Sequence, residues 1–397
     1  MTGSAFAIGS VHTITLCGVA VLVAAAAAAV WWRSEPIRVR PPATLLLAAG
    51  IGLVVYTLLQ CVPMPVRWLA AIAPSTADVW SRALVPLHES GPAWAPLTLD
   101  PPGSRIELLR GVSYLLVFVT ALRVAYRREG VSFLGGVIAA TGVLLALAAL
   151  LHPAFGAKKL FGIYEPGPGI ADGEIAPLMN PNNLAGYLNM AFCLVLASLL
   201  SRERRLPRAI AVALTAFLGA TQVWVGSRGG VIAMVIGAAS VAAIALGERV
   251  RRRDPRTWLT VGCGAATLIG GILMVLGSSE KAKFDLLVTD LSKFAILVDV
   301  AKMLPGYGVF GVGRGAFEGV FPHFRTYPGH VTFTNPENVV AQWVAEWGVP
   351  VGLVGLAAVV YALRPTAVLA RSRTAAGAWA ALAAVGAQNM ADFSSEI

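Results

Sequence analysis

A glycine-rich turn between two apolar runs holds the first side chain that could do chemistry. The turn reads Gly226-Ser227-Arg228-Gly229-Gly230, and its glycines leave the Arg228 guanidinium open to a ligand. A planar guanidinium suits phosphate bidentately, and the apolar run that follows would begin a helix whose dipole also favours an anion. The turn therefore predicts a phosphate-binding arginine. The alternative is an arginine that only extends its charge to the membrane interface.

Three asparagines precede another apolar run. Asn180, Asn182 and Asn183 flank Pro181 directly before Leu184. One asparagine at such a place caps a helix, because its side chain satisfies an otherwise unpaired backbone N–H. Three exceed this need, so Asn180 and Asn183 are also candidates for binding sugar hydroxyls or phosphate at the helix amino terminus.

The segment from Leu304 to Gly348 combines glycines, aromatic residues, histidines and charges. Its lone GxGxG pattern, from Gly311 to Gly315, lacks the strand and the βαβ unit of a dinucleotide fold and fits a backbone that closely approaches a ligand. Arg314 lies inside this pattern and is a further candidate for binding phosphate. His323 and His330 follow, each either a solvated loop histidine or a candidate site residue.

Upstream of that segment, the sequence predicts an amphipathic helix from Asp285 to Met303 on the outer surface. Its apolar residues recur at helical spacing: Leu286, Leu287, Phe294, Leu297, Val298 and Ala301. Lys293 lies on the polar side of this helix. It is either a solvated charge or a second cation for a phosphate group.

The elements that must position these residues are membrane-spanning helices. The chain has 397 residues, of which 57% are hydrophobic and 13% are charged, far from the composition of a soluble domain. We therefore predict an all-α, polytopic integral membrane protein with about 10 transmembrane helices. The apolar runs that could cross the membrane are residues 11–32, 43–62, 107–126, 131–151, 183–201, 208–226, 229–247, 257–277, 343–363 and 374–392.

The net charge of +10 does not indicate a nucleic-acid partner, because Lys and Arg lie in short clusters between apolar runs and no recognition motif accompanies them. No CxxC pair occurs, so neither a disulfide framework nor a metal site is expected. No Lys or Arg precedes the first apolar run, so a cleavable signal peptide is not expected either.

Arginine-rich loops alternate with longer segments rich in proline, glycine and aromatic residues. The positive-inside rule places the former in the cytoplasm, and the latter outside with the amino terminus. The large outer loop at residues 278–342 should contain short helices. The segment Pro63–Ile106, with Trp68, Trp80 and Trp94, should lie on the outer headgroup layer or form a wall of a lipid-substrate groove. The abrupt end after the last run suggests a fragment.

The order of these motifs resembles the O-antigen ligase and polymerase superfamily of bacterial envelope glycan enzymes. The resemblance rests on MNPNNLAGYL before one helix, GSRGG between two later helices, and PGYGVFGVGRGAF followed by NPENVVAQWVAEWG. It extends from Pro63 to Phe393, and Pro63–Pro65, Trp94–Leu99 and Met390–Phe393 look like family motifs too. It implies a single ligase-like transmembrane domain over residues 1–397.

The resemblance also implies an activity and a place. Such a protein would be a metal-independent, inverting glycosyltransferase without a cofactor, embedded in the bacterial inner membrane with its active site facing the periplasm. It would move a glycan from an undecaprenyl diphosphate carrier to a hydroxyl of a glycan, lipid or protein acceptor. Ligases use lipid A–core as acceptor, and polymerases use another lipid-linked repeat.

On this resemblance, the arginine of the family's SRGG motif is Arg228 and its second basic residue, usually arginine, is Lys293. The family's histidine–asparagine pair falls on Glu337-Asn338, so a glutamate replaces the histidine expected as general base. A carboxylate can also accept a hydroxyl proton, and His330 is the alternative base. Asn338 is expected to help bind the acceptor.

Two other hypotheses remain at the level of sequence. A catalytically altered relative would bind lipid-linked glycan without transferring it, and the residue Glu337 favours this idea. A lipid-glycan transporter is less compatible with the chain, because transport pathways need polar groups near the membrane midplane and the apolar runs contain almost no charge.

Overall fold

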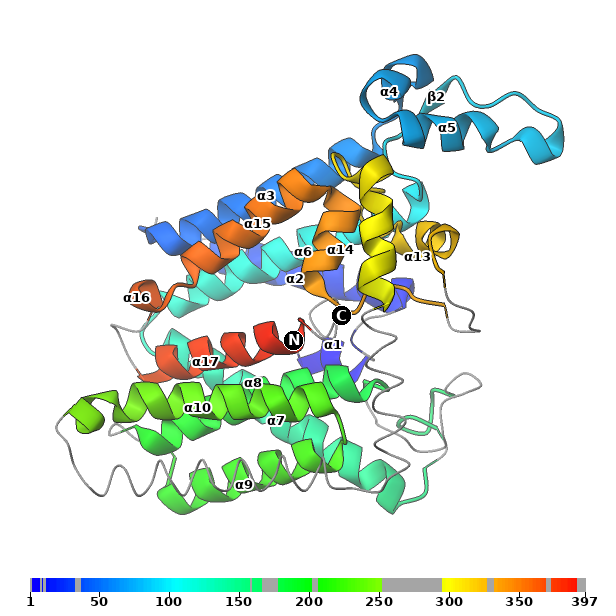
Figure 1. Cartoon of the computed structure of the whole chain (residues 1–397). Coiled ribbons are helices and arrows are strands. Elements are labelled where there is room, and N and C mark those ends of the chain that lie inside the picture. Colours follow the sequence, from blue (N-terminus) through cyan, green and yellow to red (C-terminus); the bar gives the residue numbers. More distant parts are fainter. Residues whose placement is uncertain are drawn as a thin grey trace. The chain divides into compact units, whose positions relative to one another are not determined.

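The computed structural model of the protein describes residues 2–7, 9, 12–32, 37–157, 159–165, 178–201, 206–251, 295–326, 332–368 and 373–390, without the side chains of 246–251. Over these residues the chain is mostly helical, with very little strand (Figure 1). Six helices are long and apolar enough to cross a membrane, so the prediction of an all-α membrane protein is confirmed at that level. The predicted span at 257–277, Lys293 and His330 lie outside the described residues.

The six long apolar helices coincide with six predicted spans, with shifts at their ends. They are α2 (Thr13–Trp31), α3 (Pro41–Cys61), α6 (Pro101–Ala125), α7 (Gly130–Ala154), α8 (Pro181–Leu200) and α10 (Arg228–Arg251). Three further predicted spans contain shorter helices, namely α9 (Arg208–Trp224), α15 (Val349–Ala362) and α17 (Arg373–Gln388).

The chain divides into two compact units, each assembled from separate stretches of sequence. Unit 1 consists of Met1–Leu16, Arg123–Phe284 and Arg364–Ile397, and unit 2 consists of Cys17–Leu122 and Asp285–Leu363. The predicted single transmembrane domain over residues 1–397 stays a prediction.

Helix α8 forms the centre of unit 1 and packs against α7, α9, α10 and α17. Its buried face includes Leu184, Leu188 and Ala191. Small residues let neighbouring helices approach this face closely, as Gly142 of α7 does against Ala191 and Gly237 of α10 does against Cys193. Two short helices complete the unit, α1 (Thr2–Phe6), which packs on α7, and α16 (Pro365–Val368), which precedes α17.

In unit 2, α15 packs along α3 and against α14 (Val339–Trp347). A helix at residues 295–307, α13 (Phe317–Val320) and η3 (Phe321–His323) lie beside α14 and share a core with it. The buried members of this core are Ile296, Val300, Met303, Val312, Ala316, Phe317, Phe321 and Ala345. The second half of the predicted outer loop is therefore folded around short helices, as the sequence predicts.

The apolar run at 343–363 is not one continuous helix, so the helix within this predicted span is the shorter α15. Helix α14 ends at Trp347, and Gly348 adopts φ +82° and ψ 160° before α15 begins. A Cβ at Gly348 would collide with the backbone of Val309, so only glycine permits this close approach. Hydropathy could not reveal the break because both helices are apolar.

The segment Pro63–Ile106 is folded rather than a long loop. Strand β1 (Met64–Pro65) pairs antiparallel with β2 (Trp94–Ala95), in the register Met64↔Ala95 and Pro65↔Trp94. Between them lie α4 (Val66–Ile72), α5 (Pro74–Arg82) and η2 (Val85–Leu87). Helix α6 already begins at Pro101, six residues before the predicted span, because proline is tolerated in the first turn of a helix.

Candidate functional site

The turn between α9 and α10 presents Arg228 at the first position of α10. Gly226 adopts φ +76°, which reverses the chain after α9. The Ser227 hydroxyl donates to Asn182 Oδ1 at 2.8 Å and accepts the Gly230 N–H at 3.0 Å. Ser227 thus caps α10 and ties the turn to the start of α8. This contact brings Arg228 and the asparagine cluster, both singled out from sequence, into one place.

Asn180 is the N-cap of α8, since its Oδ1 accepts the Asn182 N–H at 2.8 Å. The capping interpretation of Asn180 is therefore correct. Asn183 lies inside the first turn and is buried, and its Oδ1 has no hydrogen-bond partner among the described residues. Of the two candidate asparagines, Asn180 uses its side-chain oxygen as a cap, whereas the buried side-chain oxygen of Asn183 is not used by any described residue.

Buried carboxamides surround the start of α10. Asn189 Nδ2 donates to the Gly230 carbonyl at 2.9 Å, and Gln388 Nε2 of α17 donates to the Asn182 carbonyl at 2.7 Å. Gln222 of α9 is buried beside Gly230, and neither of its amide atoms has a partner within the described part of the chain. The sequence interpretation missed these amides, although isolated Asn and Gln in apolar runs are a signal for buried polar contacts.

The Arg228 side chain is exposed, and no ion pair or hydrogen bond joins its guanidinium to any residue that the structure describes. Its neighbours Ser227, Asn182 and Gln388 are neutral. An uncompensated guanidinium at a capped helix amino terminus can bind an anion through its own N–H groups.

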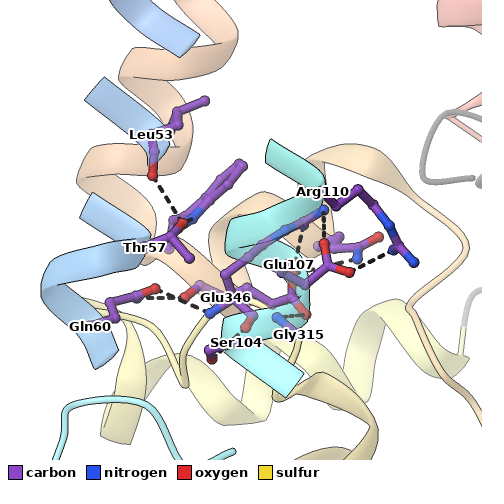
Figure 2. Close-up of polar contacts among 11 residues, drawn as sticks. Leu53, Thr57, Gln60, Ser104, Glu107, Arg110, Gly315 and Glu346 are labelled. Atoms are coloured by element: carbon purple, nitrogen blue, oxygen red, sulfur yellow. Dashed lines mark hydrogen bonds and ion pairs between the residues drawn. The ribbon is translucent and has the colours of Figure 1, made fainter. Parts of the chain in front are cut away.

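Arg314 of unit 2 has the opposite surroundings, because it pairs with the carboxylates of Glu107 and Glu346, which are labelled in Figure 2. It is buried, its Nη1 lies 2.7 Å from Glu346 Oε2, and its Nη2 lies 3.2 Å from Glu107 Oε2. Glu107 Oε1 also pairs with Arg110 at 2.6 Å, and the guanidinium stacks over the Trp347 ring at 4.8 Å. Two carboxylates thus share the charge of Arg314 inside the unit.

Neutral side chains complete this buried network. Gln60 of α3 accepts the Arg314 N–H at 3.1 Å and donates to the Phe310 and Glu346 carbonyls, both at 2.9 Å. Ser104 of α6 donates to the Arg314 carbonyl at 2.6 Å. The network therefore joins α3, α6 and α14 to the glycine-rich segment. Neither Glu107 nor Gln60 was singled out from the sequence, because their partners are distant along the chain.

The glycines of the GxGxG pattern approach the protein itself rather than an open space. All three adopt positive φ angles, and a Cβ on them would collide with Glu346, Thr98 and Glu107 respectively. The interpretation of this pattern as a backbone that approaches a ligand was therefore wrong. The pattern packs against the network around Arg314.

Glu337 lies in the turn before α14. It adopts φ +52°, a strained angle for a residue other than glycine, and its N–H donates to Asn335 Oδ1 at 3.0 Å. Asn338 is the N-cap of α14, and its Oδ1 accepts the Ala341 N–H at 2.9 Å. The candidate base is thus held between a buried asparagine and a helix cap, and the Asn338 side chain already has a structural role.

The remaining candidates are peripheral or not described. His323 is exposed at the end of η3, with its ring edge against Phe324 at 5.1 Å between centroids, as expected for a solvated loop histidine. Lys293 and His330 lie outside the described residues, so their roles stay predictions. In the described part of the chain, no group of His, Cys, Asp and Glu could hold a metal ion.

A smaller charged cluster fixes the helix at residues 295–307. The buried Asp299 carboxylate accepts from Lys302 Nζ at 2.7 Å and from the Thr326 N–H and hydroxyl, both at 2.9 Å. Burial raises the pKa of Asp299, but these hydrogen bonds and the Lys302 charge outweigh it, so the pKa lies below its usual value. Asp299 therefore holds the loop after η3 as an ionised carboxylate.

No protein-family model, curated protein or solved structure matches this chain. The resemblance to the O-antigen ligase and polymerase superfamily accordingly rests on the order of the sequence motifs alone.

Proposed function

We propose that the protein is a glycosyltransferase of the O-antigen ligase or polymerase type, acting on an undecaprenyl diphosphate-linked glycan. The observation that carries the proposal is Arg228, exposed at the start of α10 among neutral groups. A guanidinium without a carboxylate partner in the described part of unit 1 is suited to a diphosphate. The class of donor, an undecaprenyl diphosphate-linked glycan, is suggested by the order of the sequence motifs, which resembles that of the O-antigen ligase and polymerase superfamily.

The proposal includes a topology. The chain would cross the bacterial inner membrane about 10 times, with its amino terminus, Arg228 and the loop at 278–342 on the periplasmic side. The arginine-rich loops 31–40, 123–129, 201–208, 247–256 and 364–373 would then all face the cytoplasm.

In the proposed reaction, Glu337 accepts the proton of an acceptor hydroxyl on a glycan, lipid or protein. The hydroxyl oxygen attacks the anomeric carbon of the donor from the side opposite the diphosphate. The bond between that carbon and the diphosphate oxygen breaks, and the carrier diphosphate departs with the electron pair. Arg228 and Lys293 neutralise the leaving group, and the configuration at the anomeric carbon inverts. His330 is the alternative base.

Arg314 is not part of the donor site in this proposal. Its guanidinium is engaged by Glu107 and Glu346, and withdrawing it would break the ion pair of the buried Glu346 and one ion pair of the partly buried Glu107. Its proposed role is to hold α14, which follows Glu337.

The test is glycan transfer by the purified protein in nanodiscs, with undecaprenyl diphosphate-linked glycan and a candidate acceptor. We expect Arg228→Ala to lower the transfer rate about 10²–10³-fold, and Glu337→Gln to lower it about 10²–10⁴-fold. Matched controls are Arg208→Ala and Glu318→Gln, which change an exposed arginine and an exposed glutamate outside the proposed site.

Transfer at the wild-type rate in both site variants would show that these residues are wrongly assigned. A wild-type protein that binds the donor but never transfers it would instead be the catalytically altered relative, which the glutamate at position 337 favours. Movement of intact donor across the bilayer would identify a lipid-glycan transporter.

A further inference from the structure

The segment between α3 and α6, residues 62–100, forms a folded extension beyond the end of α3 (Figure 1). Its two ends meet, because the Thr98 N–H donates to the Gln60 carbonyl at 3.0 Å. Its own small core contains Leu69, Ala73, Ala77, Ala95 and Leu97. Trp80 Nε1 closes this core by donating to the Pro96 carbonyl at 3.1 Å. The extension is therefore an ordered element with defined inner and outer surfaces.

Helix α4 of the extension carries exposed apolar residues besides the one that faces the core. Leu69 faces the core of the extension and is buried, as is Ala73 directly after the end of α4. Trp68 and Ile72, also four positions apart and therefore on one side of the helix, are 59% and 48% exposed. These two side chains lie beside the one that faces the core and are not used by it, so a second apolar environment would suit them.

The exposed apolar residues of α4 follow closely in sequence on those at the end of α3, a helix long and apolar enough to cross a membrane. Leu58 and Leu59 in the last turn of α3 and Val62 directly after it are exposed, and α4 begins three residues later. Trp94, on the strand that pairs with β1, is 62% exposed. Tryptophan is enriched at the boundary between lipid headgroups and acyl chains.

The neighbouring helix α5 behaves differently. Its exposed residues include the polar Asp78, Ser81 and Arg82 beside Val79, and Arg82 pairs with Asp78. The polar part of this surface suits water. Arg67 of α4 and Arg105 of α6 are exposed cations at the base of the extension, with the reach to contact lipid phosphates.

We propose that the extension docks onto the phospholipid surface, with Trp68, Ile72 and Trp94 inserted at the headgroup–acyl boundary. Arg67 and Arg105 contact the phosphate groups, and α5 faces water. The occupant of this surface is lipid because the exposed apolar residues of α4 follow directly on those at the end of α3, a helix long and apolar enough to cross a membrane, and include a tryptophan. The inference rests on the membrane-spanning character of α3 and is independent of the proposed enzymatic activity.

The test is site-directed spin labelling in nanodiscs of phosphatidylethanolamine and phosphatidylglycerol, with the four native cysteines replaced by alanine. Single labels are introduced by Trp68→Cys and Ile72→Cys, with Asp78→Cys and Ser81→Cys as matched controls on α5. We expect labels at 68 and 72 to collide several-fold more with oxygen, which concentrates in lipid, than with a water-soluble nickel chelate. The labels at 78 and 81 should show the reverse.

Equal nickel accessibility at all four positions would overturn the proposal and indicate a surface reserved for a protein partner. Should the cysteine-free protein fail to fold, quenching of tryptophan emission by brominated phospholipids replaces the labels. Quenching should then fall in Trp68→Phe and Trp94→Phe relative to the wild type. Unchanged quenching in both variants would also overturn the proposal.

Discussion

Arg228 and Arg314 are both followed by glycine, yet the protein surrounds them in opposite ways. Arg314 is buried between Glu107 and Glu346, and its backbone is held by Gln60 and Ser104. Arg228 is exposed, and the groups around its turn are hydroxyl and carboxamide side chains. The same side chain is therefore enclosed where carboxylates approach it, and remains accessible where the described residues around its turn are neutral.

This difference has an energetic reason. A buried charge is tolerated when opposite charges and hydrogen bonds compensate it, and a site arranged in that way has little capacity left for a ligand. An exposed charge needs no such compensation and can exchange water for an anion. A glycine after an arginine therefore does not tell whether the arginine is a buried structural residue or an exposed one that can bind an anion. The position of the carboxylates around the guanidinium does.

The largest expected effect comes from truncating the two arginines. Arg314→Ala removes the cation that the buried Glu346 shares with the partly buried Glu107, so we expect a loss of about 3–5 kcal/mol in the free energy of unfolding. Arg228→Ala, at an exposed position, should change it by less than about 0.5 kcal/mol. Denaturant unfolding in detergent, followed by circular dichroism, measures both. Equal losses in the two variants would contradict the comparison.

A smaller effect is expected from the close packing around Arg228. A Cβ at Gly230 would collide with Gln222, Ala185 and Ser227, whereas a Cβ at Gly229 meets only Gln388 at an ordinary 3.9 Å. We expect Gly230→Ala to cost about 1–3 kcal/mol through overpacking. Gly229→Ala serves as the matched control, and thermal unfolding monitors both variants. Equal melting temperatures of the two variants would show that Gly230 is not as closely packed as described.

The smallest effect concerns pH and the buried carboxylate of Asp299. Because its folded-state pKa is depressed, its contribution to stability is present above the unfolded-state pKa of about 3.9 and is lost as the pH falls through the folded-state value. Asp299→Asn should cost about 1 kcal/mol at neutral pH and should flatten this acid dependence.

The control for this measurement is Asp78→Asn, which removes the exposed pair with Arg82. Exposed pairs contribute little, so this variant should follow the wild-type curve of stability against pH. A wild-type-like acid dependence in Asp299→Asn would instead show that other carboxylates cause it.

Most of the helices could be predicted from the sequence because a membrane span needs a long apolar run, and such runs are local. Six predicted spans correspond to long apolar helices. The break at Gly348 escaped prediction because it depends on the approach of Val309, which no local pattern records. The folding of Pro63–Ile106 likewise depends on the pairing of Pro65 with Trp94 across the segment.

The residues of the candidate site likewise divide into those that the sequence could predict and those that depend on distant contacts. Residue types and motif order singled out Arg228, Asn180 and Glu337, and the capping role of Asn180 followed from its position before a helix. The motif order also suggested the proposed donor. The burial of Arg314 could not be foreseen, since its partners Glu107 and Glu346 lie far away in the sequence.

The sequence by itself determined that this protein is an all-α membrane protein, because apolar composition and run length follow from the chain alone. Tertiary structure decided which charges are neutralised inside it. Folding brings carboxylates from α6 and α14 to Arg314, whereas Arg228 remains exposed beside the neutral residues at the start of α8. The physical reason is that charge compensation acts through space, between residues that only folding brings together.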